Sequence, residues 1–313
     1  MSEFTCFDFN FNNNKEKYLS VQICGGLGNQ LFQIVTAYVN SLKHNKKLVF
    51  KTSDKLFNNY NLTRKSFWKD LFSNKLNVLS ETDYKNIKFR QIYEHYNHRS
   101  IEFSLENDHN YELVGYFQSF EYFDDKFNSR NFLRHLVYSS ENYMYIAYNL
   151  YNTIKNYFTK INNTECIDDD MVSMHFRRTD YILTPNNEHN NLNLDYYIKA
   201  YNIADKNNVV IFSDDIEWCK NNIKSELFSN NTNLYFVDIN CVEIEFILLS
   251  LFKHNIIANS TFSLMASYIS YYDTKKIIIA PKDWFSEKQK KDFNFDKLGP
   301  INEIYHKDIT NII

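Results

Sequence analysis

Short apolar runs alternate with helical patterns along this chain of 313 residues. Such alternation predicts βα units built around mostly parallel sheets. The second half shows it most clearly, and its apolar runs predict five strands, at residues 171–176, 209–213, 234–238, 255–258 and 277–281. The segments between them predict four helices, at residues 195–205, 216–223, 242–251 and 262–271.

The first half repeats this pattern on a smaller scale. Apolar runs predict strands at residues 18–24, 47–51 and 112–117. Between the first two, residues 29–43 predict a helix, because apolar side chains recur there at helical spacing on one face.

The polar segment at residues 162–170 separates the two halves. We therefore expect an α/β protein with two Rossmann-like domains, residues 18–165 and residues 166–313. Residues 1–17 are expected to form a disordered leader.

Composition agrees with two packed domains. The chain is 44% hydrophobic and 23% charged, which allows it to bury more than one core. The formal net charge is −3, with Lys interleaved among Asp and Glu, so no basic field would steer nucleic acid or an anionic membrane. An anionic ligand must then be held by a local cluster of charge.

No targeting signal is visible at the start of the chain. The first residues lack a basic segment followed by an apolar one, and the longest apolar stretch, around residues 246–252, is too short to cross a bilayer. The five cysteines are odd in number and lack C-x-x-C spacing, so neither a zinc site nor a disulfide framework is expected. These features favour a soluble cytoplasmic protein without integral membrane segments.

The first polar strand end is the glycine-rich turn G-G-L-G-N-Q at residues 25–30. It predicts a close approach of backbone to a ligand or to the facing domain, followed by a helix N-terminus, with pure packing as the alternative. Leu31 occupies the third glycine position counted from Gly26 and Gly28, so this turn is a poor dinucleotide fingerprint.

The strongest chemical signal is H-F-R-R-T-D at residues 175–180, where an apolar strand runs into Arg177 and Arg178. Two guanidiniums suit a diphosphate, because each donates parallel hydrogen bonds and keeps its charge. They would stabilise a departing diphosphate without a divalent metal. Asp180 is a candidate base or a partner that orients Arg178, and His175 either lines the site or packs in the core. Structural ion pairs of the arginines with Asp180 or Asp195 are the alternative.

Two further strand ends carry acidic side chains. Ser213 and Asp214 are candidates to accept from a ribose or from guanine, whose N1 and N2 protons call for a carboxylate. Alternatively, Asp214 or Asp215 caps the following helix. Asp238, after the next strand, is a second candidate for the base or the ribose.

Ser260, Thr261 and Phe262 follow another strand, at the start of a predicted helix. Backbone N–H groups, the helix dipole and the hydroxyls would make an anion site there, although serine and threonine also serve as plain N-caps. Because the carboxyl ends of parallel strands share one edge, the polar segments of the second half are expected to converge.

These residues resemble the α-1,2-fucosyltransferase family. Its members carry, in order, a G-G-L-G-N-Q turn, an H-x-R-R-x-D motif, an F-S-D-D strand end and an N-S-T-F-S segment, and all four occur here. Further likeness at residues 114–123 and 281–285 extends the resemblance over residues 20–286.

The resemblance implies a GT-B arrangement of two facing Rossmann-like domains and an inverting transfer of fucose, in α-1,2 linkage, to a galactose-type acceptor. The C-terminal domain would hold GDP-fucose as donor substrate and the N-terminal domain the glycan acceptor, with neither a metal nor another cofactor. By position, Arg177 and Arg178 would grip the diphosphate. Residues 260–262 would lie along the nucleotide, and Asn29 would approach the sugar.

Several departures from the family leave the sugar open. Thr179 replaces a common glycine, and Leu264 and Met265 stand where aromatic residues are frequent, so transfer of a different GDP-linked or 6-deoxy sugar is also compatible with the sequence. Three rival classes of protein are an oxidoreductase that uses the glycine turn, a non-catalytic glycan- or nucleotide-binding protein, and a metal-dependent transferase. The last would use the D-x-D spacing at residues 168–170.

Overall fold

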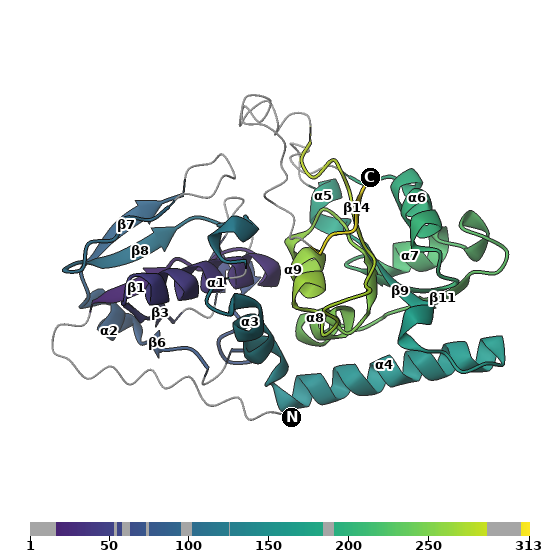
Figure 1. The fold of residues 1–313 in the computed structure, drawn as a ribbon, viewed down its shortest axis with the longest axis horizontal. Helices are drawn as coiled ribbons and strands as arrows, with labels where there is room; N and C mark the ends of the chain where they lie inside the picture. Colours follow the sequence, from purple (N-terminus) through teal and green to yellow (C-terminus); the bar gives the residue numbers. More distant parts are fainter. Residues whose placement is uncertain are drawn as a thin grey trace.

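The computed structural model describes residues 17–52, 55–57, 63–72, 75–94, 102–124, 126–183, 191–286 and 308–313. Within these ranges the chain forms two α/β units, and each has its own parallel sheet (Figure 1). The predicted fold class is therefore confirmed. The leader expected at residues 1–17 lies outside the described residues except for Lys17.

The first unit has a four-stranded parallel sheet in the order β2-β1-β8-β7. Its strands are β1 (Tyr18–Val21), β2 (Lys47–Leu48), β7 (Phe89–Tyr93) and β8 (Asn110–Val114). Its helices are α1 (Leu27–Lys43), α2 (Glu81–Lys85) and α3 (Ser129–Tyr138), with a 3-10 turn, η1, at Phe120–Tyr122. Two small pairs accompany the sheet: β3 (Phe50–Lys51) with β6 (Val78–Leu79), and β4 (Lys55–Phe57) with β5 (Thr63–Lys65).

The second unit has a six-stranded parallel sheet in the order β11-β10-β9-β12-β13-β14. Its strands are β9 (Met171–Phe176), β10 (Asn208–Ser213), β11 (Asn233–Phe236), β12 (His254–Ile256), β13 (Ile278–Ala280) and β14 (Asn311–Ile312). Its order along the chain is 3-2-1-4-5-6, the order of a dinucleotide-binding Rossmann sheet. The direction of winding reverses between β9 and β12, and open α/β sheets usually bind ligands beyond the carboxyl ends of the strands at such a switch point.

Helices connect these strands. They are α5 (Thr179–Leu183), α6 (Leu194–Ala204), α7 (Ile216–Asn222), α8 (Val242–Ser250) and α9 (Thr261–Ile269), with 3-10 turns η2 (Asp168–Asp170) and η3 (Ser225–Leu227). Side chains immediately before the helices cap several of them: Asn193 accepts from Tyr196 N at the start of α6, and Asp215 accepts from Trp218 N at the start of α7. These caps explain why polar residues stand where each helix begins.

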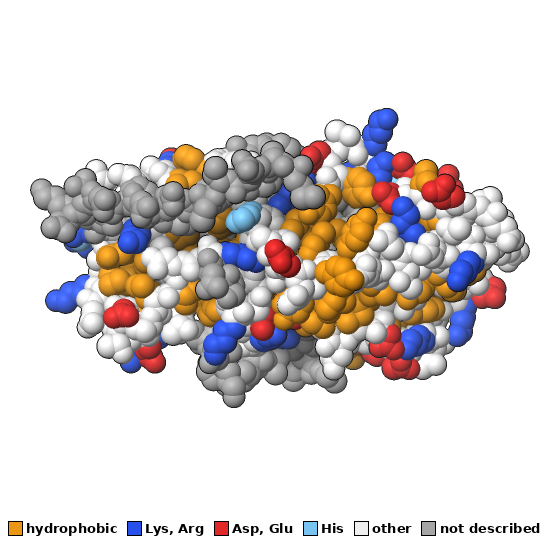
Figure 2. Space-filling model, turned by 90° about the horizontal axis from the view of Figure 1, so that it is seen from below, with side chains coloured by type: hydrophobic (Ala, Val, Ile, Leu, Met, Phe, Trp, Pro, Cys, Tyr) orange, Lys and Arg blue, Asp and Glu red, His pale blue; other side chains and the backbone are white. Residues whose placement is uncertain are grey.

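The long helix α4 (Glu141–Asn162) runs along the lower edge of the second unit and packs against α8 (Figure 1). One face is buried, at Ala147, Tyr151, Ile154 and Phe158, because these residues recur at helical spacing. The outer face is unusually apolar, with Tyr145 70% exposed, and Figure 2 shows hydrophobic side chains along this side of the molecule. Helix α4 belongs by sequence to the predicted first domain, residues 18–165, but it packs on the second unit. The predicted boundary at residue 165 therefore stays a prediction.

The structure corrects several predicted elements. The strand predicted at residues 47–51 divides into β2 and β3, which join different sheets. The strand predicted at residues 112–117 is β8, which ends at Val114 because Phe117 has a positive φ of 54° in the turn that follows. The strand predicted at residues 255–258 is β12, which ends at Ile256. Helices α3 and α4 and strand β14 were not predicted.

One apolar core continues across both units, because α1 and α3 of the first unit pack directly against α9 of the second. Aromatic rings bridge them: the Phe120 ring lies 5.1 Å from the Phe32 ring and 4.8 Å from the Tyr268 ring. We call this interface between the two units the seam. An ion pair also crosses it, in which Lys65 Nζ lies 2.5 Å from Glu243 Oε1. The units are thus joined by packing, and not only by the connecting chain.

Gly28 lies where the two units approach most closely. A Cβ added there would stand 2.4 Å from the backbone carbonyl of Thr261. We expect Gly28→Ala to destabilise the protein by about 1–3 kcal/mol, the usual cost of overpacking a filled contact, as measured by urea unfolding.

Gly26→Ser is the matched control. Nothing lies within 4 Å of a Cβ added at Gly26, which is the N-cap of α1 and has extended backbone, and serine is a favourable N-cap. Its stability should stay within about 0.5 kcal/mol of the wild type. Equal losses in both variants would show that the seam is not closely packed at Gly28.

Candidate active site

The arginine loop, residues 177–179, leaves the carboxyl end of β9 beside the switch point of the second sheet. Asp214, which follows the neighbouring strand β10, holds this loop. Its carboxylate accepts from Arg178 N at 2.8 Å, from Thr179 N at 3.2 Å and from Thr179 Oγ1 at 2.5 Å. Arg177 Nη1 lies 3.2 Å from the same carboxylate. A single acidic side chain therefore fixes the loop and one guanidinium.

Both guanidiniums keep part of their surface open. The side chains of Arg177 and Arg178 are 21% and 17% exposed, so they are neither free in solvent nor sealed in the core. Arg178 Nε lies 3.4 Å from Asp215 Oδ2. The arginines thus form ion pairs with Asp214 and Asp215, two carboxylates that the predicted alternative of structural ion pairs did not name. Asp180 belongs to α5, and its side chain lies outside what the structure describes.

His175 lies behind the arginine loop and is 2% exposed. Burial lowers the pKa of its imidazole to about 4, the nearby Arg177 charge acts in the same direction, and the Asp214 carboxylate opposes them. The ring is therefore neutral at physiological pH. Its Nδ1 atom is buried and has no hydrogen-bond partner among the described residues. Its ring centroid lies 5.7 Å from that of Phe262, which connects β9 with α9.

Residues 260–262 begin α9 on the other side of the switch point. Ser260 Oγ accepts from Phe262 N at 3.4 Å, so Ser260 acts as the predicted N-cap. Thr261 Oγ1 donates to Asn29 Oδ1 at 2.7 Å, and Gln118 Nε2 donates to the same oxygen at 2.8 Å. Asn29 of the glycine turn is therefore brought to the start of α9, with its oxygen already satisfied.

The glycine turn packs against the second unit at Gly28 and against neighbouring segments of the first unit. Gly25 has a positive φ of 76°, which its lack of a Cβ permits, and Gln30 Nε2 donates to the carbonyls of Gly25 and Lys65. Gln33 Nε2 donates to Gly115 O at 3.0 Å. The turn thus joins three segments of the first unit and presents Gly28 to Thr261.

Two residues predicted to bind the ligand, Ser213 and Asp238, form contacts with their own neighbours in the structure. Ser213 Oγ accepts from Asp215 N at 3.0 Å within its own strand end. Asp238 follows the edge strand β11, is 58% exposed and pairs with Lys220 at 2.5 Å, with β10 between it and the arginine loop. The structure therefore gathers Arg177, Asp214 and Phe262 around His175, and it leaves Asp238 at the margin.

Glu245 is a site residue that the sequence analysis missed. It lies in the first turn of α8 and is mostly buried, which raises the pKa of its carboxyl to about 8, and the charge of Asp214 adds to this effect while Arg177 opposes it. Its backbone N–H donates to Cys241 O at 3.0 Å, but its carboxyl makes no hydrogen bond or ion pair with another described residue. The available signal was an acidic residue inside the apolar run V-E-I-E-F-I-L-L at residues 242–249.

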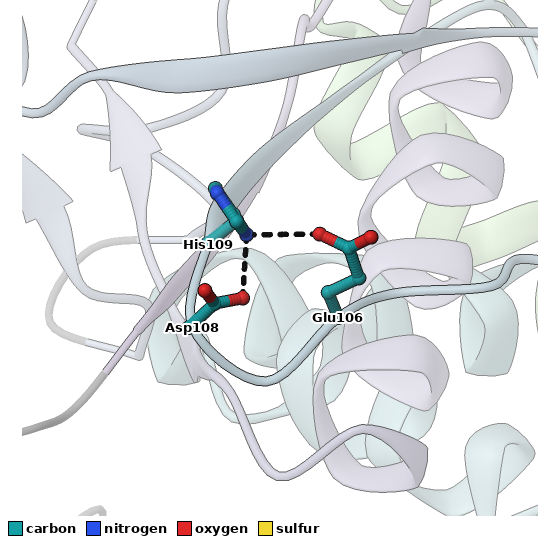
Figure 3. Close-up of side chains that lie close together, drawn as sticks. All are labelled: Glu106, Asp108 and His109. Carbon is teal, nitrogen blue, oxygen red and sulfur yellow. Dashed lines mark ion pairs between the residues drawn. The ribbon is translucent and has the colours of Figure 1, made fainter.

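A cluster of potential metal ligands lies far along the first sheet from this site. Among the described residues, Glu106, Asp108 and His109 are close enough to hold an ion (Figure 3). They precede β8, whose carboxyl end faces the glycine turn, so they stand at the opposite edge of the sheet. Arg90 Nη1 lies 2.9 Å from Glu106 Oε2, and Lys46 Nζ donates to the carbonyls of Glu106 and His109. The positive charges of Arg90 and Lys46 thus already offset the negative charge of the two carboxylates. We therefore interpret the cluster as a structural contact of this loop.

The D-x-D segment at residues 168–170 is likewise occupied by protein partners. Asp168 accepts from Lys155 and from Tyr272, while Asp169 accepts from Lys253 at 2.6 Å. The segment forms η2 before β9, at the amino end of the strand. The segment is therefore a hydrogen-bonded turn, and it lies away from the arginine loop.

Comparison with known proteins places this chain among glycosyltransferases. Residues 10–298 match the model of glycosyl transferase family 11. An α-1,2-colitosyltransferase from Escherichia coli is 30% identical over 296 residues, which cover 87% of this chain and 94% of that protein. The O-antigen biosynthesis glycosyltransferase WbnK from Escherichia coli is 28% identical over 312 residues, covering 88% and 97%.

Solved structures also share similarity with the chain. The fucosyltransferase NodZ from Bradyrhizobium is 13% identical with a TM-score of 0.46, over 81% of this chain and 93% of that one. Across the described ranges, every helix is too short or too polar to traverse a bilayer.

Proposed function

The chain belongs to glycosyl transferase family 11, and on that premise we propose that it transfers L-fucose from GDP-fucose to a hydroxyl of a glycan, with inversion at the anomeric carbon. The family match confirms the resemblance predicted from the motifs, and it makes the protein a glycosyltransferase. It excludes the oxidoreductase class. The linkage proposed is α-1,2 to a galactose-type acceptor.

The observation that carries this proposal is the pair of arginines held at the switch point. Arg177 and Arg178 stand at the carboxyl end of β9, and the N-terminus of α9 begins after the adjacent strand β12. Fixed cations and free helix N–H groups at one crevice are what a nucleoside diphosphate needs. When the acceptor oxygen attacks the anomeric carbon, the glycosidic bond to the diphosphate breaks and negative charge grows on the departing oxygen. The arginines would stabilise that charge without a divalent ion.

The structure also suggests which residue would recognise the guanine of the nucleotide. Guanine presents N1 and N2 protons to a carboxylate, but the Asp214 carboxylate is already engaged by the arginine loop. Glu245 is near Asp214 and Arg177 and has no partner of its own among the described residues. We assign guanine recognition to Glu245, with the neutral ring of His175 and the ring of Phe262 as its apolar surroundings.

The first unit would hold the acceptor. Asn29 reaches the start of α9, and its amide nitrogen would contact the transferred sugar, because its oxygen is occupied by Thr261 and Gln118. Asp180, in the first turn of α5 beside the arginines, stays a candidate base for the acceptor hydroxyl. Ser260 and Thr261 would border the nucleotide from α9.

A second donor sugar is supported by a specific relative. The Escherichia coli protein that is 30% identical is named an α-1,2-colitosyltransferase. GDP-colitose is therefore the second candidate donor, and a transfer assay should compare it with GDP-fucose directly, in the presence of EDTA. Transfer from either sugar supports the GDP-sugar assignment, whereas transfer only from a UDP-sugar would contradict it.

Arg177 provides the most direct mutational test. We expect Arg177→Ala to lower kcat/KM for transfer by about 10²–10³-fold, since it removes a fixed cation from the departing diphosphate. The kcat/KM of Arg177→Lys should fall between those of Arg177→Ala and the wild type, because lysine keeps the charge but loses the planar fork.

Arg90→Ala is the matched control, because Arg90 pairs with Glu106 at the far edge of the first sheet. Its kcat/KM should stay close to that of the wild type. Asp214 keeps its bonds to Arg178 and Thr179 when Arg177 is replaced, so the thermal midpoint should change little. Unchanged transfer by Arg177→Ala in a folded protein would refute the proposed role.

Glu245 predicts a pH dependence of nucleotide binding. Its raised pKa of about 8 means that the carboxyl is mostly protonated at neutral pH, whereas guanine needs the ionised form. Between about pH 7 and pH 8, affinity for GDP should therefore rise with pH, by up to about tenfold per unit, and then level. Calorimetric titration with GDP measures this directly.

Glu245→Gln should lose that pH dependence and should no longer distinguish GDP from IDP, which lacks the N2 amino group. Glu226→Gln, an exposed carboxyl in η3, is the control and should behave as the wild type. A pH dependence that survives in Glu245→Gln would assign the titration to another group.

A further inference from the structure

Arg178 is held by an aromatic ring that none of the motifs identifies. The guanidinium carbon of Arg178 lies 3.3 Å from the ring centroid of Trp218, which is a stacked cation–π contact. We infer that Trp218 is a positioning residue for the transfer reaction, which keeps the Arg178 guanidinium in the plane where it meets the diphosphate. This inference rests on the proposed function.

The position of Trp218 follows from the start of α7. Asp215 caps this helix by accepting from Trp218 N at 3.2 Å, and its own N–H donates to Ser213 Oγ at 3.0 Å. The same turn therefore fixes the backbone of Trp218 relative to the end of β10. Cys219, the next residue, is buried in the apolar core of the second unit, which anchors the helix.

Residues of this turn contact the Arg178 guanidinium at its flat face and at Nε, and they do not contact its two Nη atoms. Trp218 covers the flat face of the guanidinium, and Asp215 Oδ2 lies 3.4 Å from Nε. Neither Nη atom of Arg178 has a hydrogen bond to another described residue. Because stacking restrains the plane of a guanidinium but uses none of its N–H groups, both Nη atoms stay available to donate in parallel to phosphate oxygens.

Each arginine has a carboxylate partner, but the two contacts differ. Arg177 has the Asp214 carboxylate 3.2 Å from Nη1, at the end of its guanidinium. Arg178 meets Asp215 at Nε, 3.4 Å away, and its face lies against Trp218, so the described residues leave its two Nη atoms for a ligand. Without the Trp218 ring, the Arg178 side chain would sample several rotamers. Binding a diphosphate would then cost the conformational entropy of ordering that side chain, which would weaken the affinity.

We expect Trp218→Leu to weaken GDP binding and to raise KM for GDP-fucose by about 5-fold to 30-fold, the change that loss of a partly desolvated cation–π contact produces. The effect on kcat should be smaller. Trp218→Phe keeps an aromatic face and should recover binding to within about 3-fold of the wild type. Tyr271→Leu, which removes an exposed ring stacked on Tyr138, is the control and should bind GDP as the wild type does.

A double-mutant cycle with Arg178→Ala separates this role from a merely structural one. If Trp218 acts through Arg178, then Trp218→Leu should weaken GDP binding by less than about 2-fold in the Arg178→Ala background. Additive losses in the double variant would overturn the inference, as would a Trp218→Phe variant that binds as poorly as Trp218→Leu.

A folding control and the GDP affinity of the wild type separate a failed variant from a failed proposal. If Trp218→Leu does not fold, Trp218→Gln enters the same cycle, with folding checked by the thermal midpoint. Failure of wild-type protein to bind GDP would refute the proposed function itself. Normal GDP binding by the wild type together with an additive cycle would refute only the role of Trp218.

Discussion

The Asp214 carboxylate is the interaction on which the site depends. It stands at the end of β10 and accepts two backbone N–H groups and one hydroxyl from the loop after β9, while it balances the Arg177 charge. Two adjacent arginines would otherwise repel each other and remain mobile. By tying the loop to the neighbouring strand, one acidic residue fixes the backbone that carries both arginines and holds the Arg177 guanidinium, which is part of the preorganisation that charge stabilisation requires.

The second constraint is the seam between the units. Gly28 allows the backbone of the first unit to approach Thr261, and Asn29 bonds to the same residue. The glycine-rich turn, for which the sequence predicts a close approach to a ligand or to the facing domain, packs here against the facing unit and places one amide beside the start of α9. Since the apolar core continues through α1 and α9, the two units are held in register by the same contacts that stabilise the fold.

The sequence predicts five of the six strands of the second sheet, although several end earlier than predicted, because apolar runs identify parallel strands and polar residues after them identify one edge. It cannot assign partners within that edge. Asp214 and Asp238 look alike as acidic residues after strands, yet sheet order brings only Asp214 to the arginines. Glu245 and Trp218 belong to helices whose periodicity indicates packing, so only the three-dimensional arrangement reveals that they face the site.

The central claim is that a guanine nucleoside diphosphate binds at the second unit through protein cations alone. Thermal unfolding of the purified protein in EDTA, with GDP, GDP-fucose, UDP or NAD added, tests it most directly, because a ligand that binds only the native state raises the midpoint. We expect GDP and GDP-fucose to stabilise the protein, and UDP and NAD to leave the midpoint unchanged. Preferential stabilisation by UDP or NAD, or a GDP effect that appears only with a divalent ion, would contradict it.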